Sequence, residues 1–317
     1  MSTPTAPGPG SDLADPTRVP SETGEVTERN LAFSGFEYRC RIVGQNEPRT
    51  EPIVILGGSS QDRYSWTRHE RWLAAVSTVI TVDLPGYGDS DFLPSRYGID
   101  FLAEAVRHML DETGISRVNL VGACFGGIIG LRFTQHHPEL VRRMALVGMT
   151  TRIPQDYWDA VPRWWRMIER GEHDTVAAEL VAQFMSPSAA TKPVRKHGAV
   201  SRMLYHQFRS QTRNQIRMAA EHNERLVTHD CYRPDIVPET PSLVFTGESD
   251  TLTPPAMGRE LATKLPNARF TTVHEADHLL PLERMREFSE LVTRFCTDQA
   301  IDDLPYCHPV EAPTTGR

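Results

Sequence analysis

The sequence lacks the features that mark membrane, secreted and nucleic-acid-binding proteins. No apolar run approaches the roughly 20 residues that a membrane-spanning helix needs. The N-terminus, Met1 to Glu28, has neither the basic stretch nor the apolar core of a signal peptide. Basic residues are outnumbered, with 34 Lys and Arg against 41 Asp and Glu, a formal net charge of -7. We therefore expect a cytoplasmic protein with no membrane span and no nucleic-acid partner, since phosphate binding requires a basic surface.

Cysteine is also scarce, and its pattern excludes a disulfide framework. The five cysteines are odd in number and widely spaced in a chain of 317 residues, which is too long to need disulfide bridges. Reduced thiols are expected. With 39% hydrophobic and 24% charged residues, the composition is that of a globular protein able to bury a sizeable core.

Short apolar runs rich in β-branched residues alternate with longer helical patterns along most of the chain. This alternation predicts an α/β fold: a mostly parallel, twisted sheet flanked by helices on both faces. Residues 1–28 and 298–317 are Pro-rich, polar and aperiodic, so we expect a disordered N-terminal tail and a C-terminal tail outside the fold. The expected strands are 38–43, 53–58, 78–83, 118–122, 144–148, 242–247 and 270–274.

The segment 150–240 interrupts this rhythm, because it has a helical pattern and no strand signal. We interpret it as a helical cap inserted into a core formed by residues 29–149 and 241–297. Its large apolar side chains are numerous enough to cover a pocket for an acyl or other apolar group, although many must pack inside the cap itself. From this segment we expect substrate contacts from Trp158, Trp164, Trp165, Met185 and Tyr205.

The segment Gly122-Ala123-Cys124-Phe125-Gly126 lies between a predicted strand and a predicted helix. Small residues two positions before and after the central residue allow a strained turn that exposes its side chain at the carboxyl edge of the sheet. The helix that begins there directs its N-terminal dipole at the sulfur and favours the thiolate. Cys124 is therefore the candidate nucleophile, whereas taken alone it could be a buried structural thiol.

An acid and a histidine follow the last two predicted strands, in the chain order nucleophile, acid, histidine that a hydrolase-type triad requires. Asp250 lies in the loop after residues 242–247, and His278 follows residues 270–274. We expect Asp250 to orient His278 and His278 to deprotonate Cys124. Glu248 remains an alternative acid and His274 an alternative base.

The loop Gly57-Gly58-Ser59-Ser60 follows the predicted strand 53–58 and permits close approach of its backbone to substrate. We expect the backbone N–H groups of Ser59 and Phe125 to form an oxyanion hole, with Gly58 and Ser60 also at the substrate. A glycine pair here could also serve only as a turn.

His274-Glu275-Ala276-Asp277-His278 matches the His-Glu-x-x-His pattern of zinc proteases. That pattern requires a helix, which places both imidazoles on one face. The segment follows a β-rich run and precedes Leu279-Leu280-Pro281, so no helix is expected. We therefore expect no catalytic metal and no other cofactor.

These motifs together resemble the α/β-hydrolase superfamily over about Asn30 to Cys296. The resemblance rests on the segment 83–88 (Asp-Leu-Pro-Gly-Tyr-Gly), the turn at Cys124, and the spacing of Asp250 and His278. Two positions depart from the family pattern, with Cys124 at the usual serine and Gly57 at the usual histidine. Cysteine at this turn is also seen in polyhydroxyalkanoate synthases and dienelactone hydrolases. A weaker similarity, to the rhamnolipid-pathway enzyme that joins 3-hydroxyacyl groups from acyl carrier protein, implies thioester acyl donors.

The cap contains a basic stretch with no acidic residue between positions 192 and 218. It could receive the phosphate of coenzyme A or an acidic acyl carrier protein, or it could be an ordinary solvated helix surface. The residues expected to do so are Lys192, Arg195, Lys196, Arg202 and Arg209.

The cysteine favours acyl-group transfer as the function. We expect an acyltransferase or thioesterase that acts on a small-molecule thioester and forms an acyl-cysteine intermediate. Two alternatives stay open. One is hydrolysis of a small ester or lactone by a Cys-His-Asp triad, and the other is a hydrolase-fold binding protein without turnover.

Overall fold

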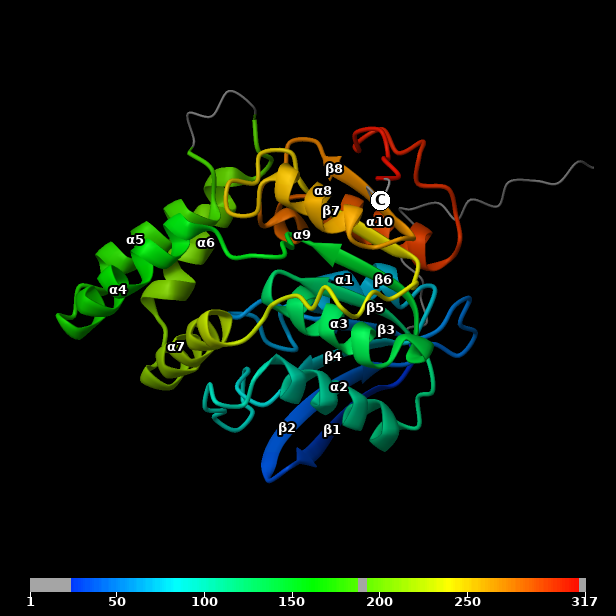
Figure 1. Cartoon of the computed structure of the whole chain (residues 1–317), viewed down its shortest axis with the longest axis horizontal. Helices are drawn as coiled ribbons and strands as arrows, with labels where there is room; N and C mark the ends of the chain where they lie inside the picture. Colours follow the sequence, from blue (N-terminus) through cyan, green and yellow to red (C-terminus); the bar gives the residue numbers. More distant parts are fainter. Residues whose placement is uncertain (1–23, 188–192, 314–317) are drawn as a thin grey trace, which may run out of the picture.

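An eight-stranded sheet forms the centre of the computed structural model, which describes residues 24–187 and 193–313 (Figure 1). The strand order is β1-β2-β4-β3-β5-β6-β7-β8. β2 runs antiparallel to β1 and β4, whereas all neighbours from β4 to β8 are parallel. This confirms the predicted mostly parallel α/β fold. The strands are β1 (Val26–Phe33), β2 (Phe36–Val43), β3 (Ile53–Leu56), β4 (Val79–Asp83), β5 (Val118–Ala123), β6 (Val141–Val147), β7 (Ser242–Gly247) and β8 (Ala268–Val273).

Helices cover both faces, so β3, β4 and β5 are buried at every position. In β3, Val54 and Leu56 pack in the cluster that includes α2, α3 and α8, whereas Ile53 and Ile55 pack in the cluster with α1 and α10. The continuous apolar run 53–56 in the sequence therefore serves two cores. The core helices are α1 (Thr67–Leu73), α2 (Ile99–Thr113), α3 (Phe125–His136), the short 3-10 helix η1 (Pro138–Leu140), α8 (Pro255–Thr263), α9 (Leu280–Glu283) and α10 (Met285–Cys296).

Four helices are inserted between β6 and β7 and lie together at one side of the sheet in Figure 1. They are α4 (Gln155–Glu169), α5 (His173–Phe184), α6 (His197–Arg209) and α7 (Arg213–Thr228), and the described residues of 150–240 form no strand. The Gln207 side chain donates to the Ser60 carbonyl at 2.9 Å, and the Glu221 carboxylate accepts from the Ser95 N–H at 2.6 Å. These bonds fix the cap on the core. None of the helices within 24–187 and 193–313 has the length and apolar character required to cross a membrane.

The expected C-terminal tail is instead part of the core, which corrects the boundary at residue 298. Ile301 and Leu304 are buried with α10 and the neighbouring strands. The segment then runs beside β8, where the His308 N–H donates to the Thr272 carbonyl at 2.9 Å. At the other end, β1 begins at Val26, inside the expected tail 1–28. The rest of that tail, residues 1–23, lies outside the described residues, as do residues 314–317.

The buried C-terminal segment generates a stability prediction. Leu304→Ala should lower the free energy of unfolding by about 2–5 kcal/mol, since it leaves a cavity in a packed site. Urea unfolding followed by circular dichroism measures the change. Asp302→Ala is the matched control, because this exposed side chain forms only a surface ion pair with Arg269, typically worth about 0–1 kcal/mol. Equal stability of Leu304→Ala and the parent would contradict the packing of this segment.

Candidate active site

The turn between β5 and α3 holds Cys124 in a strained backbone conformation, with φ 49° and ψ -116°. A non-glycine residue in such a region costs about 1–3 kcal/mol and persists only where its surroundings fix it. Close packing fixes it here: a Cβ on Gly122 would lie 2.5 Å from the Gly127 Cα, and one on Gly126 would lie 2.2 Å from the Leu56 carbonyl oxygen. The tight glycine contacts therefore hold the chain so that Cys124 stands at the carboxyl edge of the sheet.

The loops after β7 and β8 bring Asp250 and His278 together beside Cys124. The His278 Nδ1 is 3.0 Å from the Asp250 Oδ2, and the ring also interacts with the Cys124 side chain. Because Nδ1 faces the carboxylate, Nε2 is the nitrogen available to the sulfur. The carboxylate is itself held by hydroxyl groups of Thr246 and Thr253 and by the Thr253 N–H, which is 2.8 Å from Oδ1. The loops thus bring Asp250 to His278, and His278 lines the same cavity as Cys124.

Burial and mutual pairing shift the pKa values of both Asp250 and His278. Burial alone would raise the pKa of Asp250, but the charge of His278 and the hydrogen bonds from His278 and Thr246 outweigh it and lower that pKa. Burial alone would lower the pKa of His278, but the Asp250 charge and the hydrogen bonds to Asp250 and Cys124 raise it well above its ordinary value. The pair therefore favours an imidazolium next to a carboxylate.

Ser59 and Phe125, whose backbone N–H groups are the expected oxyanion donors, line one cavity together with Cys124. Phe125 is the first residue of α3, so its N–H has no acceptor within the helix. In the loop after β3, the Gly58 N–H donates to the Gln61 side chain at 2.8 Å, which leaves Ser59 as the next donor along this loop. Ser59 lines the cavity that contains Cys124. This arrangement places both expected oxyanion-hole residues at the site.

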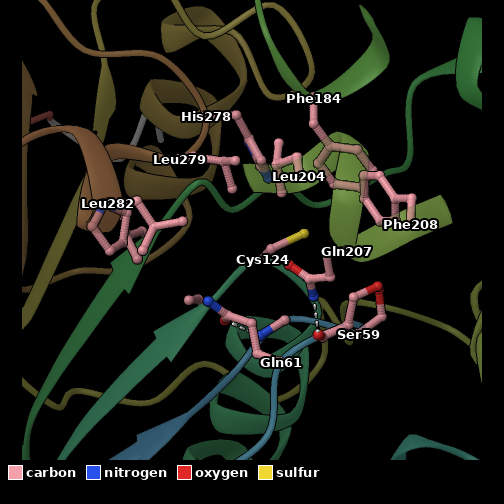
Figure 2. A pocket seen from close by; sticks show the side chains of 15 residues that line it. Ser59, Gln61, Cys124, Phe184, Leu204, Gln207, Phe208, His278, Leu279 and Leu282 are labelled. Carbon is pink, nitrogen blue, oxygen red and sulfur yellow. Dashed lines mark hydrogen bonds between the residues drawn. The ribbon is translucent and has the colours of Figure 1, made fainter. Parts of the chain in front are cut away.

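Apolar side chains from the cap and from the loop after β8 surround the sulfur (Figure 2). They enclose a cavity of about 690 Å³, including its open mouth, which is also lined by Gly58, Ser60, Cys124 and His278. Such a volume accommodates an extended apolar chain or a small ring. The apolar walls are formed by Val147, Phe184, Leu204, Phe208, Leu279, Pro281 and Leu282.

A second cavity of about 560 Å³ extends from Ser59 and Ser60 beneath the cap helices. One polar pair lies in its wall, where the Tyr157 hydroxyl donates to the Asn223 Oδ1 at 2.8 Å. Burial, with a smaller contribution from the charge of nearby Cys124, raises the pKa of Tyr157, so the phenol stays neutral. This pair is the point in the cap wall where a polar group of a substrate could be hydrogen-bonded.

The structure separates the expected cap contacts into two groups. Trp164 and Trp165 line the cavity beneath the cap. Met185 is instead buried against Val200 and Leu204 in a core cluster, Tyr205 donates its hydroxyl to Asp174, and Trp158 packs on Tyr157. The expectation of substrate contact is therefore corrected for Met185 and Tyr205, whose side chains pack within the cap or bond at its surface, and it stays a prediction for Trp158.

The alternative acid and base lie elsewhere. The Glu248 carboxylate accepts from the Glu275 N–H at 2.8 Å, and the His274 Nδ1 is 3.8 Å from the Glu248 Oε2. Residues 274–278 form a turn in which Glu275 has a positive φ of 54°. The helix required by the zinc-protease pattern is therefore absent from this described segment.

The expected basic surface is partly neutralised by ion pairs. Arg195 pairs with Glu275, and Arg209 pairs with Asp174. Lys196 and Arg202 are exposed on α6 or at its start, and Lys192 lies outside the described residues.

Residues that the sequence analysis did not single out support His278. Thr253 lies 3.1 Å from its Nδ1, and Gly148 lies beneath the ring, since a Cβ there would be 3.0 Å from the His278 Cε1. Glu283 accepts the Asp277 N–H at 2.6 Å, and burial raises the pKa of Glu283 to about 8. Local signals in the sequence mark two of these residues. Thr253 follows Asp250 by three positions, and Gly148 comes directly after the strand that ends at Val147.

The paired pKa shifts predict how His278 responds to loss of its partner. Asp250→Asn should lower the pKa of His278, because burial still opposes the imidazolium whereas the amide no longer stabilises it. Imidazole resonances followed by NMR against pH, assigned with His278→Gln, measure the shift. Glu248→Gln should leave the His278 titration unchanged. A shift in Glu248→Gln and none in Asp250→Asn would reverse the assignment of the acid.

Comparisons with known proteins agree with this architecture. The family model for the alpha/beta hydrolase fold matches residues 51–284. A pimeloyl-[acyl-carrier protein] methyl ester esterase of Neisseria meningitidis is 28% identical over 248 residues, covering 77% of this chain and 76% of the relative. The dihydrolipoyllysine-residue acetyltransferase component of the acetoin cleaving system of Pseudomonas putida is 24% identical over 247 residues; the match covers 77% of this chain and only 63% of that relative.

A solved structure is also similar over most of the chain. The enol-lactonase from Burkholderia xenovorans superposes with a TM-score of 0.72 at 26% identity, covering 85% of this chain and 100% of that chain. Because the family match spans more than half of the sequence, the chain belongs to the alpha/beta hydrolase fold family of enzymes.

Proposed function

We propose that the protein is an acyl-transfer enzyme that takes an acyl group from a thioester onto Cys124 and passes it to a second nucleophile. The observation that carries this proposal is the cysteine at the strained turn, paired with His278 and Asp250 beneath an apolar cavity. A cysteine that is only structural would need neither the partners nor the cavity.

In the first step, the Cys124 thiolate attacks the carbonyl carbon of the thioester. The carbonyl electron pair moves to oxygen, where the N–H groups of Ser59 and Phe125 stabilise the negative charge. The bond from carbon to the donor sulfur then breaks, and the imidazolium of His278 protonates the departing thiolate. The products are acyl-Cys124, the free donor thiol and neutral His278.

In the second step, neutral His278 removes a proton from water, an alcohol or an amine as that group attacks acyl-Cys124. Collapse of the second intermediate releases the Cys124 thiolate and leaves His278 protonated, which restores the starting state. Asp250 stays ionised throughout and stabilises the imidazolium. Water as acceptor gives a thioesterase, and an alcohol or amine gives an acyltransferase.

The preference for a thioester follows from the leaving groups. Exchange of one thioester for another changes little in free energy, so acyl-Cys124 forms readily and remains reactive. With an unactivated ester or amide, the Cys124 thiolate leaves the tetrahedral intermediate more easily than alkoxide or amide does, so attack tends to revert. A free thiol of this kind also fits a reducing, cytoplasmic setting.

The donor would be carried by coenzyme A or an acyl carrier protein. Exposed Lys196 and Arg202 supply positive charge on the cap for a pantetheine phosphate or an acidic carrier, and Arg195 and Arg209 would add to it on release of their ion pairs with Glu275 and Asp174. Two similar proteins support this donor class. One is an esterase for the methyl ester of pimeloyl-[acyl-carrier protein], and the other is the acetyltransferase component of the acetoin cleaving system.

Hydrolysis of a small ester or lactone is the second candidate, favoured by the structural similarity to an enol-lactonase. A binding protein without turnover is the third. The retained His278–Asp250 pair speaks against it, because a pure binding site has no need for a buried imidazolium–carboxylate pair.

The acyl-cysteine intermediate is tested by intact-protein mass spectrometry after mixing with a panel of acyl-CoA and acyl-pantetheine thioesters. We expect an acyl adduct on the parent protein, none on Cys124→Ala, and a slower ester adduct on Cys124→Ser, because a hydroxyl is the weaker nucleophile at neutral pH.

The absence of both adduct and thioester turnover across the panel would overturn the thioester proposal. Rapid turnover of p-nitrophenyl esters by the same sample would then support ester hydrolysis. A Cys124 that reacts with iodoacetamide no faster than a free cysteine would support a binding role.

The cavity walls predict a change in chain-length preference. Leu204→Trp should raise KM roughly tenfold for a decanoyl donor. The larger ring would fill the space of about two methylene groups of the acyl chain, and burial of each contributes ~0.8 kcal/mol to binding. A butanoyl donor should be little affected. Met203→Trp is the matched control, because Met203 is 42% exposed on the same helix. An equal loss with both donors would place the acyl chain elsewhere.

A further inference from the structure

A cluster of two histidines and a glutamate lies at the ends of β7 and β8, outside the catalytic cavity. Glu248 follows β7, His274 follows β8, and His308 belongs to the C-terminal segment, which is red in Figure 1. The Glu248 Oε2 is 3.2 Å from the His308 Nε2 and 3.8 Å from the His274 Nδ1. The two imidazole rings are 4.0 Å apart between centroids.

Backbone hydrogen bonds hold all three residues in place. The His274 N–H donates to the Tyr306 carbonyl at 2.9 Å, and the His308 N–H donates to the Thr272 carbonyl at 2.9 Å. The Glu248 N–H donates to the Val273 carbonyl at 3.0 Å. Its Oε1 accepts the Glu275 N–H at 2.8 Å, which orients Oε2 toward the imidazoles. The backbone positions of Glu248, His274 and His308 are therefore fixed by hydrogen bonds.

We propose that Glu248, His274 and His308 form a binding site for a divalent transition metal, with Zn²⁺ as the preferred ion. Ligand atoms each ~2.0–2.1 Å from a tetrahedral zinc ion stand about 3.3–3.4 Å apart. The separations here bracket that value, and the three ligand atoms lie within 4.8 Å of one another. Small rotations of the side chains would bring all three to one ion.

The donor set selects the class of ion. Two imidazoles and one carboxylate suit zinc, copper, iron or nickel, whereas magnesium and calcium prefer oxygen ligands alone. The Glu275 N–H on the second carboxylate oxygen is the kind of supporting bond that orients a metal ligand. The neighbouring hollow, lined by Arg195, Arg284 and Pro305 as well as by Glu248 and His274, leaves room for water as a fourth ligand.

This site differs from both the catalytic site and the zinc-protease pattern. The hollow shares no lining residue with the cavity around Cys124. Of the two histidines in the literal pattern, His278 binds Asp250 and only His274 belongs to the cluster. Glu248 precedes Asp250 by two positions and His274 precedes His278 by four. A bound ion would therefore tie both catalytic loops to the C-terminal segment.

The test is zinc titration of the full, untagged chain by isothermal calorimetry in a Cys124→Ala background, which removes the competing thiolate of the catalytic site. We expect one ion per chain. Adding His308→Ala should weaken binding by at least about tenfold, since even loss of a supporting bond typically costs ~10–100-fold. The side chain of His308 is 41% exposed, so this change should not disturb folding, and the melting temperature without metal checks it.

The chain offers a matched control in Glu104, His136 and His137, whose ligand atoms also lie within 4.8 Å of one another. That cluster is half-buried between α2 and the end of α3, and His136 is also 3.4 Å from Asp100, which pairs with Arg132. It therefore has the ordinary contacts of an ion-pair network. His137→Ala in the same background should leave zinc binding unchanged.

Cobalt provides an independent readout that requires no activity. Co²⁺ should produce the visible absorption of a tetrahedral site without a thiolate charge-transfer band, because Cys307 is packed against the core and is not a ligand. Failure to saturate with zinc, persistence of binding in His308→Ala, or its loss in His137→Ala would overturn the proposal and leave an ion-pair cluster only.

Discussion

The backbone at Cys124 is the constraint from which the rest of the site is positioned. A φ of 49° is tolerated there because Gly122 and Gly126 let β5, α3 and the end of β3 approach more closely than any larger side chain would permit. Sheet packing thus maintains local strain in one residue. The same close approach brings the loop that contains Ser59 beside the sulfur. The positions of Cys124 and of the Ser59 backbone therefore both depend on the contact between Gly126 and the end of β3.

His278 and the cap share the buried carboxylate of Asp277. Asp277 accepts the His278 N–H at 2.8 Å on one oxygen and the Ser186 N–H of the cap on the other. A buried carboxylate needs such partners, because an unpaired charge in the interior is costly. Placement of the cap over the cavity and the backbone position of His278 are therefore coupled through one side chain.

The parts of this structure that follow from sequence are those with strong local patterns. Apolar runs such as 53–56 identified the central strands, and chain order placed Asp250 and His278 at neighbouring strand ends. Adjacent cap residues could not be separated in this way: Phe184 ends α5 and faces the cavity, whereas Met185 turns into a core cluster. Composition does not specify which side of a short helix meets a cavity.

The ends of the chain were mispredicted for a related reason. No position of β1 is fully buried, so its sequence has no strong apolar signal, and the segment after 298 is Pro-rich although Ile301 and Leu304 are buried. The cluster of Glu248, His274 and His308 could not be predicted from the sequence either. His308 lies beside His274 only because the C-terminal segment folds along β8.

The position of the C-terminal segment along β8 also bears on aggregation. β8 is the last strand of the sheet, and an edge strand exposes unpaired N–H and C=O groups to which a strand of another molecule can add. Bridges from Cys307 to Val273 and from Glu311 to Phe270 occupy part of that edge. The opposite edge, β1, carries the charged residues Glu28 and Arg29. A chain cleaved before these bridges would keep Cys124, Asp250 and His278 but present β8 as a template for intermolecular sheet growth.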